Sequence, residues 1–267
     1  MKILEDDEKI REKLGRVDLE NSEWIDLPSD FLEGTKLCYF TAAQDASLPE
    51  FSGVLFEDEY IWSSDNVRIS RYKMLSSLDA IFTLPINAVK LLLKLENPIK
   101  FTEESGWIHF MTESGVVFST APLDRQFPLD KIKELCFDYG CDIKGWEREE
   151  EVEQNEEYYI WPDALMDYID VAGIMAEEHE DFAVRAIKIR REGNTLLVGG
   201  VRDTGSVETP VEFEGDMFEE GISILIQPDF LKYIMGITLR FCIQEESVIK
   251  FETDRLLQIM SVYVEAI

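Results

Sequence analysis

The sequence predicts an α+β protein made of tandem repeated domains, each with two helices backed by antiparallel β-sheet. Three observations lead to this expectation. The chain has 267 residues, enough for two domains of ordinary size. Amphipathic helical segments alternate with strand-like runs. The same order of elements then recurs in the second half of the chain, at offsets of about 134 to 142 residues, which indicates an internal repeat.

The first copy opens with a predicted helix at residues 28–43. Its apolar face would carry Phe31, Leu32, Cys38, Tyr39 and Ala42. Asp30 and Glu33 lie near its start, where negative charge suits the helix dipole. A second helix is predicted at residues 86–95. Apolar runs typical of strands lie at residues 52–57, 59–64, 67–74, 98–103, 106–111 and 115–121.

The second copy repeats this order. A helix is predicted at residues 161–176, and residues 222–237 repeat the strand-then-helix pattern of residues 81–95 in the first copy. The other strand-like runs of the second copy lie at residues 183–190, 194–200, 207–213, 238–244, 247–253 and 256–264.

The domain boundaries follow from the repeat and from one acidic segment. Residues 144–158 are rich in glutamate and poor in core-forming side chains, which is typical of an exposed linker. We therefore expect one domain at residues 25–143 and the other at residues 159–267. Residues 1–24 belong to neither copy, and we interpret them as an appendage or a remnant.

A formal net charge of −29 disfavours non-specific attachment to nucleic acid or to an anionic membrane, because the field of the whole molecule repels both. Any DNA contact must then come from locally clustered lysines. No apolar run approaches a membrane span, and the start of the chain is acidic where a secretory signal would be basic. We expect a soluble, cytoplasmic protein without membrane contact.

Cysteine usage agrees with a reducing compartment. No CxxC pair occurs, so the thiols are expected to be reduced and buried, and a disulfide or metal role is the less expected alternative. The cysteines are Cys38, Cys136, Cys141 and Cys242.

Enzyme signatures are absent from the sequence, including the glycine-rich nucleotide loops and the HExxH and GxSxG motifs. His109 and His179 are the only histidines and lie far apart, which leaves little for a metal centre or a Ser/His/Asp relay. His109 stands between Ile108 and Phe110, which favours an ordinary strand position. We expect no catalytic residues, no cofactor and no metal.

Several segments resemble the bacterial DNA polymerase III beta subunit, the DNA sliding clamp. Residues 52–74 resemble a hairpin that leads into the family's Thr-Asp-Gly-His-Arg-Leu turn, with Asn and Val in place of Gly and His. Residues 82–132 resemble the family's middle domain, and residues 161–264 its C-terminal domain. In this chain the turn reads Ser64-Asp65-Asn66-Val67-Arg68-Ile69.

The resemblance implies a DNA-clamp fold and a polymerase processivity factor that encircles duplex DNA without reading its sequence. Family members carry three such domains and close a ring from two subunits, whereas this chain matches the second and third. A homo-oligomer is therefore implied, a trimer if a six-domain ring is kept, and otherwise a truncated or open form. The alternative is a non-encircling acidic adaptor or decoy that binds replication proteins.

The resemblance also implies a peptide-binding cleft between the last two domains, where polymerase and clamp loader insert short peptides. Aromatic and aliphatic walls would supply burial, about 25 cal/mol per Å² of apolar area, and polar groups would fix the peptide. The alternative is that Phe51, Ile69 and Phe182 are core residues. The matching positions are Phe51, Ser64, Arg68, Ile69, Pro128, Phe182, Gln227, Phe230 and Met260.

For DNA, the expected contacts are lysines on the helices of both copies. Asn87, Lys90 and Lys94 form a polar stripe at the second predicted helix. Lys36 and Lys232 occupy helices of the first and second copy. Ordinary solvated lysines are the alternative, and the helix at 161–176 opposes DNA contact because its charged stripe contains only acidic residues. These are Asp163, Asp167 and Asp170.

Overall fold

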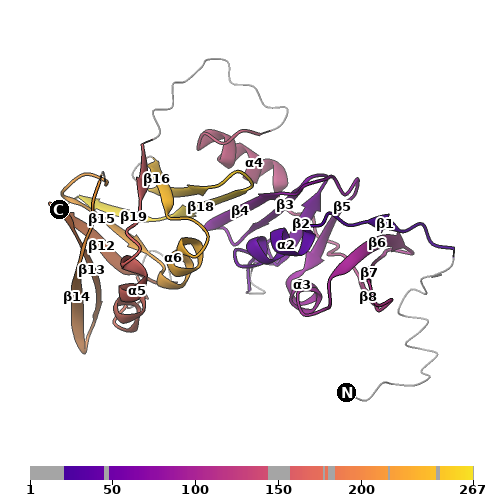
Figure 1. Ribbon diagram of the computed structural model, residues 1–267, viewed down its shortest axis with the longest axis horizontal. Helices are drawn as coiled ribbons and strands as arrows, with labels where there is room; N and C mark the ends of the chain where they lie inside the picture. The colour runs from indigo at the N-terminus through magenta and orange to yellow at the C-terminus, as the bar shows by residue number, and fades with distance from the viewer. Residues whose placement is uncertain are drawn as a thin grey trace. The chain divides into compact units, whose positions relative to one another are not determined.

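The chain forms two compact units, Met1–Ile132 and Lys133–Ile267, whose elements are traced in Figure 1. The boundary falls within helix α4 (Leu129–Asp138). The computed structural model describes residues 21–44, 48–143, 157–176, 178–179, 184–215, 217–244 and 247–266.

Two helices lie side by side in the first unit, α2 (Phe31–Tyr39) and α3 (Ile86–Leu92). The buried positions of α2 have the spacing of one helical face. They are Phe31, Gly34, Thr35 and Cys38. A Cβ at Gly34 would lie 2.9 Å from Cδ1 of Ile61 and closer still to the ring of Tyr72. Glycine at this position therefore lets the helix approach the sheet closely.

Both helices are shorter than the sequence predicts. Helix α2 starts at Phe31, and the carboxylate of the preceding Asp30 does not cap it. It accepts hydrogen bonds from the Leu75 N–H at 3.0 Å and from the Tyr72 hydroxyl at 3.1 Å. After α3, the Leu95 N–H bonds the carbonyl oxygen of Leu92 at 3.1 Å, a turn tighter than an α-helix.

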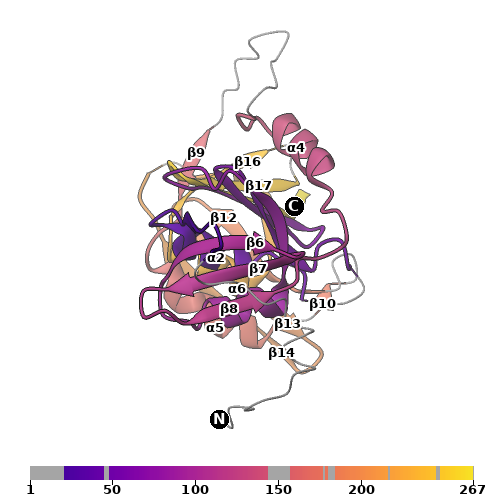
Figure 2. The same ribbon diagram turned by 90° about the vertical axis from the view of Figure 1, so that its right-hand side faces the viewer.

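The sheets of the first unit are antiparallel and have the strand orders β5-β2-β3-β4 and β1-β6-β7-β8. Figure 2 shows β6, β7 and β8 as neighbouring strands. The strands are β1 (Ile25–Asp26), β2 (Gly53–Glu57), β3 (Tyr60–Ser64), β4 (Arg68–Lys73), β5 (Ile81–Pro85), β6 (Pro98–Glu104), β7 (Trp107–Thr112) and β8 (Val117–Thr120).

Phenylalanine rings join the helix and both sheets in the core of the first unit. Phe31 of α2 stacks on Phe56 of β2 with ring centroids 5.1 Å apart, and Phe56 stacks on Phe82 of β5 at the same distance. Phe82 lies 5.7 Å from Phe101 of β6, and Phe31 lies 5.8 Å from Phe110 of β7. Burial of such large apolar side chains is the main stabilising term of the unit.

The second unit repeats this architecture around helices α5 (Leu165–Ile174) and α6 (Pro228–Met235). Its antiparallel sheets have the orders β14-β13-β12-β15-β19 and β18-β17-β16-β9. A separate short pair joins β10 (Glu178–His179) to β11 (Val184–Arg185). The other strands are β9 (Tyr158–Ile160), β12 (Ile187–Glu192), β13 (Thr195–Arg202), β14 (Gly205–Glu212), β15 (Ile222–Ile226), β16 (Arg240–Gln244), β17 (Val248–Glu252), β18 (Leu256–Ser261) and β19 (Tyr263–Ala266).

Aromatic rings also build the second core. Trp161 stacks on Phe241 with centroids 4.1 Å apart and planes 9° apart. Phe251 lies 6.2 Å from Phe241 and 6.0 Å from Phe230 of α6. Trp161, Phe230, Phe241 and Phe251 are all fully buried.

The end of α5 is fixed by two arginines from the surrounding strands. Arg185 donates to the carbonyl oxygens of Gly173 at 2.6 Å and Ala176 at 3.3 Å, and Arg202 donates to that of Ala176 at 3.2 Å. Positive groups at a helix C-terminus satisfy its carbonyls and suit its dipole. Helix α5 has no basic residue in its own last turn, so the strands supply this stabilisation.

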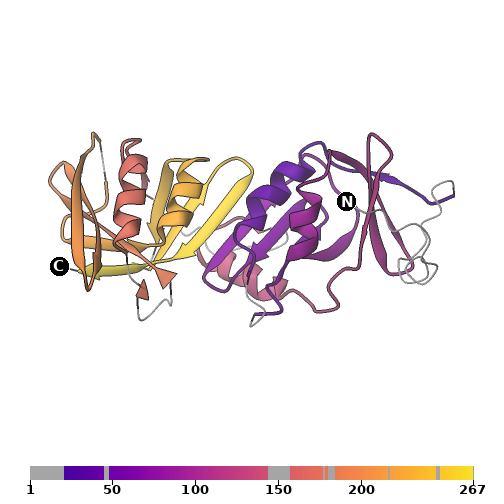
Figure 3. The same cartoon turned by 90° about the horizontal axis from the view of Figure 1, so that it is seen from below.

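The predicted tandem repeat of two helices and antiparallel sheet is confirmed. Strand β2 pairs with β3 and β5, as β12 pairs with β13 and β15. Likewise β6 pairs with β1 and β7, as β16 pairs with β9 and β17. Within each unit the two helices lie side by side, as Figure 3 shows. Helix α4 and strands β1, β9 and β10 were not predicted from the sequence.

The expected linker at 144–158 and the expected appendage at 1–24 lie largely outside the described residues, so their form stays a prediction. None of the described helices has both the length and the apolar character needed to cross a membrane.

Candidate functional site

The turn between β3 and β4 is organised by the carboxylate of Asp65. Its Oδ1 accepts hydrogen bonds from the backbone N–H of Val67 at 3.1 Å and of Arg68 at 2.7 Å. Asn66 has a φ of +74°, in the left-handed region that asparagine tolerates better than most residues. In the turn that this segment resembles, glycine stands at the position of Asn66. Asparagine can adopt the same left-handed conformation.

The same carboxylate orients the side chain of Arg68. Asp65 Oδ2 accepts a hydrogen bond from Arg68 Nε at 2.8 Å, and the ion pair is only 13% exposed on the arginine and 17% on the aspartate. The guanidinium carbon lies 5.4 Å from the ring centroid of Phe40, just after α2. Arg68 is therefore held between a carboxylate and an aromatic ring, a geometry suited to presenting a charged donor.

Other predicted peptide contacts of the first unit gather around Ala43. The Ala43 N–H lies 3.0 Å from the carbonyl oxygen of Phe51 and 3.3 Å from that of Ser64. Ser64 is also the register partner of Ile69 across β3 and β4. The structure thus brings Phe51, Ser64, Arg68 and Ile69 into one region of the first unit.

Phe51 and Pro128 are half-buried at the edge of this region. The Phe51 ring meets Phe127 edge to face, with centroids 6.2 Å apart. Phe40 and Phe127, two rings that contact Arg68 and Phe51, were not predicted from the sequence. The only clue in the sequence would have been an aromatic residue close to a predicted site residue. That clue is not specific, because this chain has many aromatic residues.

In the second unit, the predicted positions differ in exposure. Gln227 precedes Pro228 at the start of α6 and is half-buried. Phe230 is fully buried, and Met260 of β18 is 3% exposed opposite Ile249. Phe182 lies outside the described residues.

Burial divides the predicted peptide contacts into two groups. Ser64, Ile69, Phe230 and Met260 are buried, which agrees with core roles. Phe51, Arg68, Pro128 and Gln227 keep partial exposure. The assignment of these positions to a peptide cleft stays a prediction.

The lysines of the first unit that were predicted to face DNA are exposed. Lys36 lies on α2 and Lys90 on α3, whereas Lys94 lies beyond the end of α3 at Leu92. Asn87 and Lys90 share the exposed face of α3, and Lys94 follows them in the turn. The predicted polar stripe is therefore present, although its last member is outside the helix.

Lys232 of the second unit is differently placed. Its Nζ forms an ion pair with Oδ2 of Asp170, so α6 and α5 are joined through opposite charges. Asp163, Asp167 and Asp170 are all exposed. The acidic stripe predicted from the sequence is thus on the surface.

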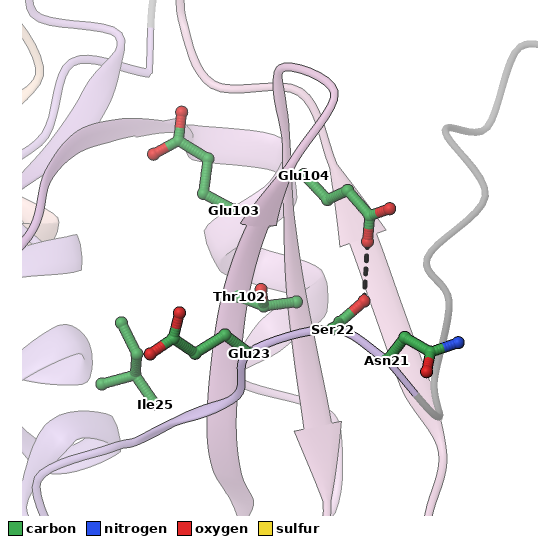
Figure 4. Close-up of a pocket in the computed structure, with 7 residues that line it drawn as sticks. All are labelled: Asn21, Ser22, Glu23, Ile25, Thr102, Glu103 and Glu104. Carbon is green, nitrogen blue, oxygen red and sulfur yellow. Dashed lines mark hydrogen bonds between the residues drawn. The ribbon is translucent and has the colours of Figure 1, made fainter.

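A shallow pocket of about 460 Å³ lies beside β6, between that strand and the segment that leads into β1. Figure 4 shows Ser22 donating to Glu104 across it, at 2.7 Å. The lining residues are Asn21, Ser22, Glu23, Ile25, Thr102, Glu103 and Glu104. No metal-ligand cluster occurs among the described residues, and this pocket was not predicted from the sequence.

The remaining reactive side chains lie inside the protein. All four cysteines are buried, as predicted, and burial raises the pKa of the Cys38 thiol well above its usual value. His109 lies in β7, as predicted, with no exposed area and with Nδ1 2.7 Å from Ser119 Oγ. Burial lowers the pKa of its imidazole, so the neutral form is favoured.

No protein-family model and no curated protein matches the sequence. The fold, by contrast, is similar to solved sliding clamps. The Bacillus subtilis DNA polymerase sliding clamp matches 94% of this chain and 67% of its own, at 14% identity and a TM-score of 0.67. The Helicobacter pylori beta clamp, solved with a DNA ligase peptide, matches 94% of this chain and 68% of its own, at 16% identity and a TM-score of 0.67.

The Borrelia burgdorferi DNA polymerase III subunit beta matches 95% of this chain and 68% of its own, at 13% identity and a TM-score of 0.70. The chain thus spans about two thirds of the length of these proteins. The agreement extends over both units rather than over a single motif. The chain therefore has the fold of the bacterial DNA polymerase III beta sliding clamps.

Proposed function

We propose that this protein is a DNA sliding clamp, a non-enzymatic processivity factor that encircles duplex DNA in the cytoplasm. The observation that carries the proposal is the similarity of fold to beta sliding clamps over 94% of the chain. Function does not follow from fold alone. The exposed lysines of the first unit add a surface suited to the phosphate backbone, without base-specific contacts.

Polymerase and clamp-loader peptides are the proposed protein partners. Phe51, Arg68 and Pro128 of the first unit combine apolar area with a charged donor and keep partial exposure. Such a surface suits a short peptide with a few apolar anchors. The peptide-bound clamp of Helicobacter pylori supports this kind of partner by analogy.

The proposal requires an assembly of several chains. Three copies would supply six units, the number expected for a closed ring. A closed ring would hold DNA by topology, so equilibrium affinity for a short duplex can be weak while retention on a circle is long. Retention on circular DNA can therefore test the function even if the equilibrium affinity for a short duplex is weak.

The test is to load the protein onto circular DNA with its loader and then to cut the circle. Retention on the intact circle followed by release after cutting supports encirclement. Equal retention on circular and cut DNA would mean ordinary surface binding. Failure to associate with the circle, with the loader active on a control clamp, would contradict the proposal.

A second candidate function is a non-encircling adaptor that binds replication proteins. The exposed acidic stripe of Asp163, Asp167 and Asp170 favours it, because carboxylates repel the phosphate backbone. The mass of the protein in solution separates the two functions. A monomer that still binds polymerase peptides would support the adaptor.

A further inference from the structure

The two units present opposite charge on their helical faces. Around α2 and α3 the exposed charged side chains are three lysines and two glutamates, a net charge of +1. These are Lys36, Lys90, Lys94, Glu33 and Glu96. Asp30, just before α2, does not add to this face because it is 6% exposed and bonded to Tyr72 and Leu75.

Around α5 and α6 the balance is reversed. The exposed charged side chains are four aspartates and one lysine, a net charge of −3. They are Asp163, Asp167, Asp170, Asp229 and Lys232. The same architecture thus carries an attractive face for phosphate in one unit and a repulsive face in the other.

The lone lysine of the second face is already engaged. Lys232 Nζ is paired with Asp170 Oδ2, and the two side chains are 44% and 65% exposed. A phosphate would have to displace this carboxylate and would also meet Asp167 one turn earlier on α5. Lys232 therefore contributes little attraction in the native protein.

The nearby arginines of the second unit are also engaged in contacts within that unit. Arg185 and Arg202 donate to backbone carbonyls at the end of α5. Arg190 forms ion pairs with Glu192 and Glu208 on the strands. Arg185 and Arg202 keep their positive charge, which offsets part of the negative charge at the end of α5, whereas Arg190 is neutralised by its carboxylate partners.

We infer that duplex DNA is contacted through the α2–α3 face alone, and that the α5–α6 face repels it because Asp170 withholds Lys232. This inference rests on the proposed clamp function and specifies its DNA contact. Each lysine that neutralises a phosphate adds about 0.9 to the salt slope of binding, so Lys90 and Lys94 together give a slope of about 1.8 per chain. The attraction of each chain for DNA is then weak and comes from one of its two helical faces, which suits a protein that moves along DNA.

The test measures binding of a short duplex to the full-length protein by fluorescence anisotropy between low and moderate salt. Lys90→Ala should reduce the salt slope by about 0.9, whereas Lys232→Ala should leave it unchanged. Asp170→Asn should release Lys232 and increase the slope by about 0.9. The double variant Asp170→Asn with Lys232→Ala should lose that gain.

Asp254→Asn is the matched control, because this exposed aspartate lies in the turn between β17 and β18 and not on a helix. It removes the same charge and should change affinity much less than Asp170→Asn does. The triple variant with asparagine at 163, 167 and 170 should bind the duplex several-fold more tightly than the native protein at low salt.

The outcomes separate this inference from the proposed function. If Lys232→Ala weakens binding as much as Lys90→Ala, the one-sided contact is wrong while the clamp function stands. If the native protein binds the duplex and the triple asparagine variant binds it with the same affinity, the one-sided contact is also wrong while the clamp function stands. If neither the native protein nor the triple variant binds duplex and neither is retained on circular DNA, both proposals fall.

Discussion

Arg68 is the predicted peptide contact whose geometry can be tested most directly. It is partly exposed, and Asp65 and Phe40 hold it in one orientation. Phe230, by contrast, is fully buried against Phe251, so its replacement would disturb the core before it could report on a ligand. Exposure therefore decides which of the predicted residues can serve as a probe.

Arg68→Ala should weaken binding of a polymerase-derived peptide, whose affinity we expect to lie in the micromolar range. Loss of hydrogen bonds from a charged donor predicts a decrease of about tenfold or more. Arg71→Ala is the control, since Arg71 lies on the same strand and stacks over Tyr60 and Trp62 instead. Calorimetry on folded variants gives the affinities, and equal binding by Arg68→Ala would remove Arg68 from the site.

His109 gives a prediction on pH. Its imidazole has no exposed area, and burial lowers its pKa below the usual 6.5. As the pH falls below about 6.5, the unfolded chain takes up a proton at this residue before the folded chain does. The native state therefore loses stability over this range, by at most about 1.4 kcal/mol per pH unit.

Urea unfolding at pH 8 and pH 5 measures this effect, with His109→Gln as the reference. The many carboxylates titrate in both proteins, so the difference between the two isolates the histidine. We expect the native protein to lose more stability on acidification than the variant. An identical loss in both would show that His109 can be protonated without cost in the folded protein.

At the scale of elements, the sequence predicted the order of helices and strands because each has its own periodicity. Apolar runs bounded by turn residues identified β2, β3 and β7, and the recurrence of the pattern identified the second copy. Helix ends were less predictable. Asp30 was expected to act through its charge near the helix start, but its carboxylate bonds Tyr72 and Leu75, which lie more than 40 residues away.

Elements that depend on distant partners were missed for the same reason. Strand β1 has two residues and exists only by pairing with β6. Strand β9 similarly has three residues and pairs with β16. The Lys232–Asp170 ion pair joins residues 62 positions apart, so the sequence could suggest the lysine but could not reveal that it is engaged.

The contact of α5 with β13 depends on one glycine. A Cβ at Gly200 would lie 2.9 Å from the carbonyl carbon of Met175 and closer still to the carbonyl oxygen of Ala172. These are backbone atoms of the helix end and cannot rotate away. Gly200→Ala should therefore push α5 off the sheet, at a cost of about 1–3 kcal/mol.

Gly173→Ala is the matched control on the facing helix. Its Cβ would meet Pro228 at 3.4 Å, an ordinary contact, and alanine favours helix over glycine by up to about 1 kcal/mol. Denaturant unfolding should show a large loss for the first variant and none for the second. Similar stability for both would mean that the α5–β13 contact adjusts at low cost.

At the scale of the whole molecule, assembly is the property on which the proposed function depends. Strands β8 and β14 end their sheets within their own units. Unpaired sheet edges invite pairing with another chain. A ring built from copies of this protein could therefore join the β14 edge of one copy to the β8 edge of the next.

The register of β14 shows which of its backbone groups are available. Pro210 lies opposite Leu197 of β13 and has no N–H to give. A proline is tolerated in an edge strand where the missing N–H would point away from the neighbouring strand. The backbone N of Pro210 therefore faces away from β13. Because this direction alternates along a strand, the N–H groups of Glu208 and Glu212 also point outward.

Glu212→Pro should therefore remove an outward donor while it leaves the β13–β14 ladder intact. If copies join through β14, sedimentation should show a fall from the assembled mass, three times 30.9 kDa for a trimer, toward the single chain. Glu212→Ala, which keeps the N–H, should assemble like the native protein. An unchanged mass for a folded Glu212→Pro variant would exclude this edge as the junction, and a native protein that is already monomeric would leave no ring to close.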